Sequence, residues 1–210
     1  MKKQITIDII SDIICPWCYI GKARLERAIA SFKDDLEVII TMRPFLLYPH
    51  IPVGGVEKEQ FSKLKKPGLG TLLREEAAKE NIVIDYRKID RVPNTLEAHR
   101  LMYLCKEDAV KNELGKILFR MYFEEGKDVE DKTVLLAVAK EAGVKEEVIQ
   151  QFETSTAGTE EVQADIAYLK EEGISAVPSF IINKEHLIVG AQPMRNFERY
   201  FSKLVAKKRE

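Results

Sequence analysis

Residues 4–42 read QITIDIISDIICPWCYIGKARLERAIASFKDDLEVIITM, and this stretch decides the fold. Its first part, about residues 4–10, alternates between apolar and polar and then runs apolar, as a strand does when it enters a core. A helix is predicted from Cys15, and a second strand over 36–42. Strand, helix and strand within about 40 residues predict a βαβ unit with parallel strands and a right-handed crossover.

The helix between these strands has one apolar face. Its apolar residues recur three and four positions apart: Cys18, Gly21, Leu25, Ala28, Ile29 and Phe32. We expect its charged residues on the other faces: Lys22, Arg24, Glu26 and Arg27.

After residue 43 the pattern becomes helical and later returns to strands. Helical spacing predicts helices over 69–80, 96–110, 113–125, 131–143 and 145–152. The chain then continues with a helix over 159–172, a hairpin of strands 179–182 and 186–189, and a final helix from Pro193. We therefore predict an α/β protein with a βαβ half and a ββα half, interrupted by an α-helical insertion. The predicted boundaries are 1–48 plus 157–210 for the sheet domain and 49–156 for the insertion.

The composition excludes several classes of partner. Thirty-three basic and 34 acidic residues nearly cancel, so no global field attracts the chain to nucleic acid or to an anionic membrane. The sequence contains no apolar window of about 18 residues, so no membrane span is predicted. The segment after Met1 lacks the long apolar core and the small-residue cleavage site of a secretory signal, which predicts a cytoplasmic protein.

Cys15 and Cys18 form a CxxC motif at the start of the first helix. With three cysteines in 210 residues, such a pair arises by chance in only about 3% of chains. Residues three apart on a helix share one face, within the Cα separation that a disulfide tolerates. The unpaired N–H groups at a helix N-terminus favour a thiolate, and Pro16 fits the first turn because its missing N–H leaves no bond unmade. We therefore predict Cys15 as the exposed nucleophile and Cys18 as the more buried resolving thiol.

Two other uses of a CxxC motif are disfavoured. Zinc takes about four ligands, usually two such pairs or a pair of histidines. The remaining candidates are scattered along the chain: His50, His99, Cys105 and His186. We therefore predict no metal site. A purely structural disulfide would close so short a loop that it would constrain little of the unfolded chain.

The sequence CPWCYIG at 15–21, after a strand that ends in Ser11-Asp12, resembles the FrnE branch of the DsbA-like thioredoxin family. Supporting segments follow in the family's order over nearly the whole chain: Arg43-Pro44-Phe45, Asn94-Thr95, Ala98-His99, Val177-Pro178 and Gly190-Ala191-Gln192-Pro193. The resemblance implies a thioredoxin-like fold with an α-helical insertion. It also implies that Pro178 is cis and lies beside the two cysteines, with the Val177 backbone presented to a bound substrate chain as to an added strand.

Other residues have both a functional and a structural interpretation. Asp12 could relay protons to the dithiol or bond its own backbone in a turn. Trp17 could meet a peptide or thiol substrate at the rim of the site or serve as a half-buried surface anchor. His99 and Gln192 could contact substrate, or they could be a satisfied helical histidine and a capping residue. Cys105 is expected to be a small buried apolar residue.

These features predict a thiol–disulfide oxidoreductase or isomerase that acts on a disulfide- or dithiol-containing protein or small molecule, as a monomer or homodimer. No cofactor is predicted, apart from glutathione as a possible co-substrate. The resembling family also includes kappa-class glutathione transferases and hydroxychromene-carboxylate isomerases, which typically carry Ser where Cys15 stands. A glutathione-dependent isomerase or transferase is therefore the alternative hypothesis, and a redox-linked peptide-binding module is a third.

Overall fold

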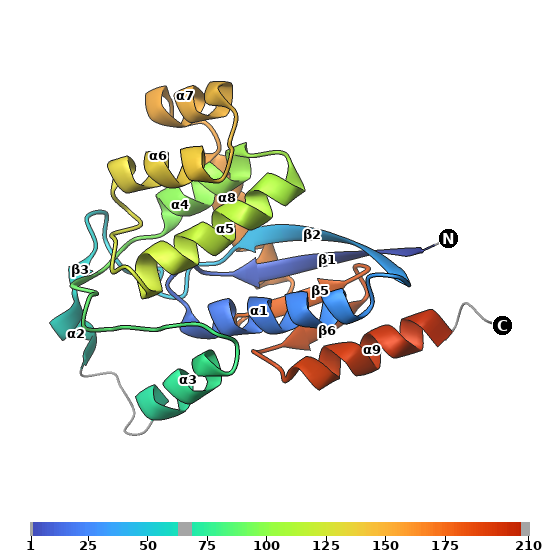
Figure 1. The fold of residues 1–210 in the computed structure, drawn as a ribbon. Coiled ribbons are helices and arrows are strands. Elements are labelled where there is room, and N and C mark those ends of the chain that lie inside the picture. Colours follow the sequence, from blue (N-terminus) through green and yellow to red (C-terminus); the bar gives the residue numbers. More distant parts are fainter. Residues whose placement is uncertain (1, 63–68, 207–210) are drawn as a thin grey trace.

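The computed structural model describes residues 2–62 and 69–206. Its main sheet combines strands from the beginning and the end of the sequence (Figure 1). Strand β1 (Lys3–Ser11), helix α1 (Pro16–Ser31) and strand β2 (Leu36–Pro44) form the predicted βαβ unit, and β1 and β2 are parallel. Strand β5 (Ser179–Ile182) pairs antiparallel with β1, and β6 (His186–Val189) pairs antiparallel with β5. The strand order β2-β1-β5-β6, closed by helix α9 (Met194–Ala206), confirms the α/β class and its two halves.

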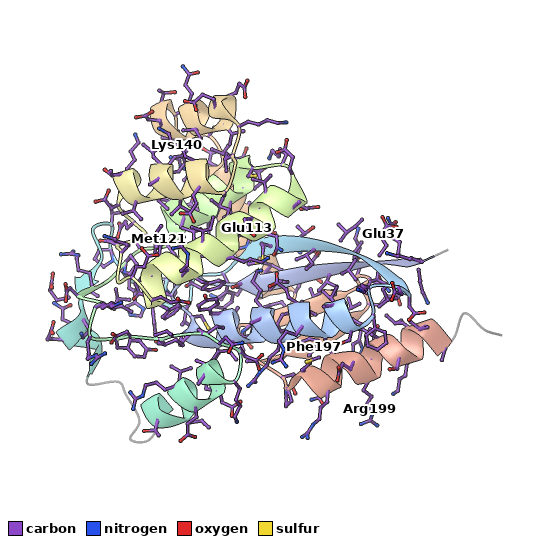
Figure 2. All side chains as sticks on the ribbon, viewed as in Figure 1. Glu37, Glu113, Met121, Lys140, Phe197 and Arg199 are labelled. Atoms are coloured by element: carbon purple, nitrogen blue, oxygen red, sulfur yellow. The ribbon has the colours of Figure 1, made fainter. Side chains whose placement is uncertain are left out.

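Helix α9 covers the sheet beside α1 with an aromatic face. Phe197 and Phe201 are fully buried, and the Phe201 ring meets the ring of Phe32, the residue after α1, edge to face at 5.7 Å between centroids. Figure 2 shows Phe197 pointing toward α1 while Arg199 points away from the sheet. This alternation at helical spacing is what the sequence predicts for the last helix.

The segments between β2 and helix α8 (Thr159–Glu171) are mostly helical, as predicted. They are β3 (Val56–Glu57), α2 (Lys58–Ser62), α3 (Leu69–Ala78), β4 (Arg91–Val92), α4 (Leu96–Leu104), α5 (Asp108–Phe123), α6 (Lys132–Glu141) and α7 (Glu146–Thr154). Figure 1 shows α4 to α7 gathered on the β2 side of the sheet. Their buried side chains belong to the same apolar cluster as those of β1 and α9, so the described helices extend the core of the sheet. The boundaries at 48/49 and 156/157 stay a prediction.

The predicted break between two of these helices was wrong. Helix α4 ends at Leu104 and α5 begins at Asp108, whereas the sequence predicted a helix to about 110 and a new one from 113. Cys105 and Glu107 adopt extended backbone conformations between the helices. No glycine or proline marks this link, so the usual stop signal is missing. The other predicted bounds agree within about two residues.

Lys22 and Arg24, which the sequence predicts on the faces of α1 outside its apolar stripe, are nevertheless buried. Their exposed fractions are 2% and 6%, because α3 and α5 cover the sides of α1 that the sheet leaves free. The Lys22 ammonium lies 2.6 Å from the Glu26 carboxylate, and Arg24 donates to the carboxylates of Glu76 and Glu80. Buried charges are tolerated when they are paired in this way.

Candidate active site

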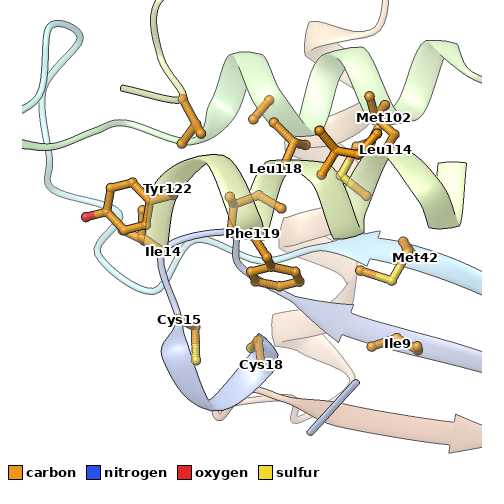
Figure 3. Close-up of a cluster of buried hydrophobic side chains, with 14 of the residues drawn as sticks. Ile9, Ile14, Cys15, Cys18, Met42, Met102, Leu114, Leu118, Phe119 and Tyr122 are labelled. Carbon is orange, nitrogen blue, oxygen red and sulfur yellow. The ribbon is translucent and has the colours of Figure 1, made fainter. Parts of the chain in front are cut away.

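The two cysteines occupy the first turn of α1, where the chain leaves β1. Cys15 is the residue just before the helix, with an extended backbone, and Pro16 takes the first helical position. The Cys15 N–H donates to the Asp12 carbonyl at 3.0 Å, and the Cys18 N–H donates to the Cys15 carbonyl at 3.0 Å. Both thiols are free, and Figure 3 shows them below α5, with Cys18 close to the ring of Phe119. The local geometry is that of a dithiol at a helix N-terminus, as predicted.

Cys15 is buried, which corrects the prediction of an exposed nucleophile. Its exposed fraction is 3%, and that of Cys18 is 0%, so only the predicted order of burial holds. Tyr48, after β2, and Tyr86, between α3 and β4, are half-buried in the same core. Burial raises the pKa of both tyrosines, that of Tyr86 to about 12, and a charge on Cys15 adds to each shift. Segments distant in sequence therefore contribute to the core that buries Cys15, and a motif read locally cannot reveal them.

The loop before β5 lies against the Cys15 thiol. The Val177–Pro178 peptide bond is cis, as the family resemblance implies. The Cys15 thiol donates to the Val177 carbonyl, with 3.8 Å between Sγ and O. The Gly190 N–H donates to the Pro178 carbonyl at 2.7 Å, which ties the loop to the end of β6. The fold thus brings Val177 and Pro178 to the dithiol from the far end of the chain.

The surroundings of Cys18 disfavour its thiolate form. Its complete burial raises its pKa well above the usual value, and the neighbouring Cys15 thiol raises it further. The Ser11 hydroxyl and the Asp12 backbone N–H act in the opposite direction, because both favour the thiolate. Ser11 was not singled out in the sequence, although it follows Ile5, Ile7 and Ile9 at the inward-facing positions of β1 and is the only hydroxyl in that series.

Asp12 and His99 are buried together beneath the turn that precedes Cys15. The Asp12 carboxylate accepts the N–H of Leu47 at 2.6 Å and the N–H of Ile14 at 3.4 Å, so it does bond the backbone of its own turn. The His99 Nε2 atom lies 3.0 Å from the Phe45 carbonyl oxygen and 3.7 Å from the Asp12 carboxylate. A relay role for Asp12 and a substrate contact for His99 stay predictions.

The positions of three further residues, Gln192, Trp17 and Cys105, agree with the structural interpretation of each. Gln192 donates to the Val189 carbonyl at 2.7 Å and accepts from Asn196 at 2.8 Å, which fastens the start of α9. Trp17 is half-buried, and Cys105 is buried away from the dithiol at the end of α4. Within residues 2–62 and 69–206, no three His, Cys, Asp or Glu side chains gather as metal ligands would. No helix in the described part of the chain is long and apolar enough to cross a membrane.

Gly21 lets α1 approach the loop that carries Pro178. A Cβ atom at Gly21 would lie 2.9 Å from the Pro178 Cγ atom and 3.2 Å from the Phe180 ring. Alanine in a helix is normally favoured over glycine by about 1 kcal/mol. We expect Gly21→Ala to lower the free energy of unfolding by about 1 to 3 kcal/mol instead, because the loop has to shift. Gly70→Ala is the control in urea denaturation, since that exposed helical position is open, and equal effects of the two changes would contradict the prediction.

A four-stranded sheet with a CxxC dithiol at the start of α1 and a cis-proline loop against it defines a thioredoxin-like redox fold. The DSBA-like thioredoxin domain family matches residues 6–202, and the chain belongs to that family. The uncharacterized protein YwbO of Bacillus subtilis is 29% identical over 202 residues, which are 93% of this chain and 95% of YwbO. A probable DsbA oxidoreductase from Streptomyces coelicolor superposes with a TM-score of 0.80 and 30% identity, over 95% of this chain and 89% of that one.

More distant structures share the fold alone. A 2-hydroxychromene-2-carboxylate isomerase has a TM-score of 0.76 at 16% identity, over 97% of each chain. The cytosolic disulfide reductase DsbM from Pseudomonas aeruginosa, whose structure contains GSH, has a TM-score of 0.63 at 17% identity, over 96% of this chain and 99% of DsbM. Family membership and the Streptomyces structure support a thiol–disulfide oxidoreductase or isomerase as the general class.

Proposed function

We propose that this protein exchanges dithiols and disulfides through Cys15 and Cys18. The observation that carries the proposal is the position of the Cys15 sulfur, at the N-terminus of α1 and 3.8 Å from the Val177 carbonyl oxygen, with Cys18 on the same helical turn. The unpaired N–H groups of a helix N-terminus favour the thiolate that such a reaction needs.

The proposed exchange has two steps. The Cys15 thiolate attacks a substrate disulfide, whose first sulfur leaves as a thiolate, and a mixed disulfide forms. The Cys18 thiolate then attacks the Cys15 sulfur, the mixed disulfide breaks, and the second substrate sulfur leaves. Two electrons pass from the protein to the substrate, and the reverse sequence oxidises a dithiol. The assignment to the FrnE branch forms part of this proposal.

The surroundings of Cys15 suggest how a substrate would bind. Val177 would offer its backbone to an extended substrate segment beside Pro178, while Trp17 would meet the substrate at the rim. Because Cys15 is 3% exposed, the substrate sulfur has to reach it on a thin segment or a small molecule rather than on a flat protein surface. We therefore include low-molecular-weight disulfides, with glutathione as co-substrate, among the substrates of the proposal.

We further propose that the protein works in the cytoplasm as a reductase or isomerase. Its three cysteines are few enough for a reducing compartment, and DsbM, which shares the fold, is a cytosolic reductase. Related dithiols span potentials of about −270 to −120 mV, and the value for this pair decides the direction of electron flow. Subcellular fractionation tests the location.

The test of the dithiol itself is a series of glutathione redox buffers, followed by alkylation and mass analysis. We expect Cys15 and Cys18 to lose their free thiols together as the buffer becomes oxidising, while Cys105 stays reduced because it is buried apart from them. The midpoint gives the reduction potential. A pair that never closes in excess oxidised glutathione would refute the proposal.

A glutathione-dependent isomerase or transferase is the second candidate, favoured by the fold shared with 2-hydroxychromene-2-carboxylate isomerase. In that case Cys15 would activate a bound thiol, and Cys18 would be dispensable. A glutathione complex and turnover that survives Cys18→Ser would support it over dithiol exchange.

A further inference from the structure

Arg24 of α1 is a buried arginine whose partners come from two distant parts of the chain. Its exposed fraction is 6%. The Nε atom donates to the Glu80 carboxylate at 2.9 Å, and Nη2 donates to the Glu76 carboxylate. The Nη1 atom donates to the Ala191 carbonyl oxygen at 2.8 Å, in the turn between β6 and α9. All three nitrogens of the planar guanidinium therefore have an acceptor, which fixes the orientation of the group.

The turn that contains Ala191 supports the cis-proline loop. The Gly190 N–H donates to the Pro178 carbonyl oxygen at 2.7 Å. Val177, the other residue of the cis peptide bond, accepts from the Cys15 thiol, with 3.8 Å between Sγ and O. A short chain of contacts therefore leads from the Ala191 turn to the nucleophilic sulfur.

The remaining hydrogen bonds of residues 190–192 do not connect this turn to α1. The Gln192 N–H donates to the Gly190 carbonyl oxygen at 2.8 Å, and the Gln192 side chain joins Val189 and Asn196. Within residues 2–62 and 69–206, the bond from Arg24 is the only hydrogen bond between α1 and residues 190–192. The position of this turn relative to the helix that begins after Cys15 therefore depends on Arg24.

We propose that Arg24 is a positioning residue, which holds the cis-proline loop at a fixed distance from Cys15 and thereby favours peptide substrates. This inference rests on the proposed function, in which a peptide pairs with the Val177 backbone. A peptide needs the loop in one place, whereas a small disulfide needs only the Cys15 sulfur. Lysine would offer a single ammonium in place of the oriented fork, so it cannot bond two carboxylates and a carbonyl with the same geometry.

Kinetics with two disulfides test this role in the Arg24→Lys variant. The substrates are a synthetic peptide with one disulfide and 2-hydroxyethyl disulfide, with dithiothreitol as the reductant. We expect the KM for the peptide to rise about tenfold, the effect of one or two displaced hydrogen bonds. The kcat for the peptide should stay nearly unchanged, because the lost interaction contributes equally to the bound substrate and the transition state. Both constants for 2-hydroxyethyl disulfide should stay within about twofold of the wild type.

A pH profile of Cys15 alkylation by iodoacetamide shows whether the chemistry of the sulfur is intact. The profile of Arg24→Lys should match that of the wild type, because Arg24 acts through the loop. An altered profile, an equal rise in KM for both disulfides, or no rise at all would overturn the positioning role.

Arg27→Lys is the matched control. Arg27 lies one turn further along α1 and bonds the same Glu80 carboxylate at 2.5 Å, together with the Lys79 carbonyl oxygen at 3.4 Å, so its partners all lie just after α3. Both disulfides should show wild-type constants in this variant, and a rise in the peptide KM equal to that of Arg24→Lys would contradict the proposal. If Arg24→Lys does not fold, Glu76→Gln weakens one of the two acceptors that orient Arg24 and should raise only the peptide KM, about threefold.

Hydrogen exchange of the Gly190 N–H separates the positioning role from the proposed function. This proton is bonded to the Pro178 carbonyl oxygen, so it should exchange about tenfold faster in Arg24→Lys and at the wild-type rate in Arg27→Lys. Equal exchange in all three proteins would overturn the positioning role. A wild-type protein that reduces neither disulfide would overturn the proposed function, while the exchange rates would still decide whether Arg24 holds the loop.

Discussion

Replacing Cys15 with serine is expected to reduce the rate of disulfide exchange to that of the uncatalysed reaction. A serine hydroxyl does not ionise near neutral pH, so the attacking anion is lost and the mixed disulfide cannot form. Cys18→Ser should keep the first attack and lose the second, so covalent adducts with substrate should accumulate on Cys15. Insulin reduction in the presence of dithiothreitol measures turnover, and intact-protein mass spectrometry detects the adducts.

Cys105→Ala is the control for this pair of variants. Cys105 is buried at the end of α4, and its thiol contacts the Glu107 carbonyl oxygen at 3.8 Å, so its removal should leave exchange unchanged. Full activity in both Cys15→Ser and Cys18→Ser would exclude the proposed mechanism. Loss of activity in Cys15→Ser alone, with glutathione-dependent turnover in Cys18→Ser, would favour the isomerase or transferase.

The largest loss of stability is expected from Gly126→Ala. Gly126, after α5, has a φ of +70°, and a Cβ atom there would lie 2.2 Å from the Lys88 carbonyl oxygen. The left-handed backbone costs alanine about 1 to 2 kcal/mol, and the overlap adds about 1 to 3 kcal/mol because backbone has to move. We expect the free energy of unfolding to fall by about 2 to 5 kcal/mol in urea denaturation. Activity should fall as well, since the segment that holds Lys88 also carries Tyr86, which packs against the same core as Cys15.

Comparison with Gly143→Ala separates the steric part of this effect from the conformational part. Gly143 also has a positive φ, +76°, but a Cβ atom there would meet nothing within 4 Å. The free energy of unfolding of Gly143→Ala should therefore fall only by the conformational cost of about 1 to 2 kcal/mol, and activity should be unchanged. Equal losses of unfolding free energy in the two variants would show that the contact with Lys88 does not affect stability.

The sequence was most informative for elements whose structure is determined by the spacing of nearby residues. The strands over 179–182 and 186–189 have the predicted bounds, because a short apolar run bounded by a turn has few alternative arrangements. The CxxC motif likewise placed both cysteines at the start of the helix, because a helix tolerates proline only in its first turn. Such features depend on residues that are neighbours in the chain, so the sequence alone can predict them.

The sequence was least informative where tertiary contacts decide the outcome. Lys22 and Arg24 look solvent-exposed in a helix considered alone, but α3 and α5 cover them and Glu26, Glu76 and Glu80 pair with them. The link at 105–107 has no local stop signal. These features depend on residues far away in sequence, which periodicity does not record.

The site of Cys15 shows the same limit. The motif indicated which sulfur attacks, but Cys15 is buried in a core to which segments after β2 and after α3 also contribute.

The pairing of β1 with β5 has a consequence for biosynthesis. Cys15 and Cys18 leave the ribosome well before Val177 and Pro178, which lie on the far side of the helical segments in the sequence. At ordinary rates of translation, the interval is on the order of 10 s. During that time the nascent chain carries two unshielded sulfurs, which cellular thiols and oxidants can modify before the β5 hairpin docks and closes the pocket around them.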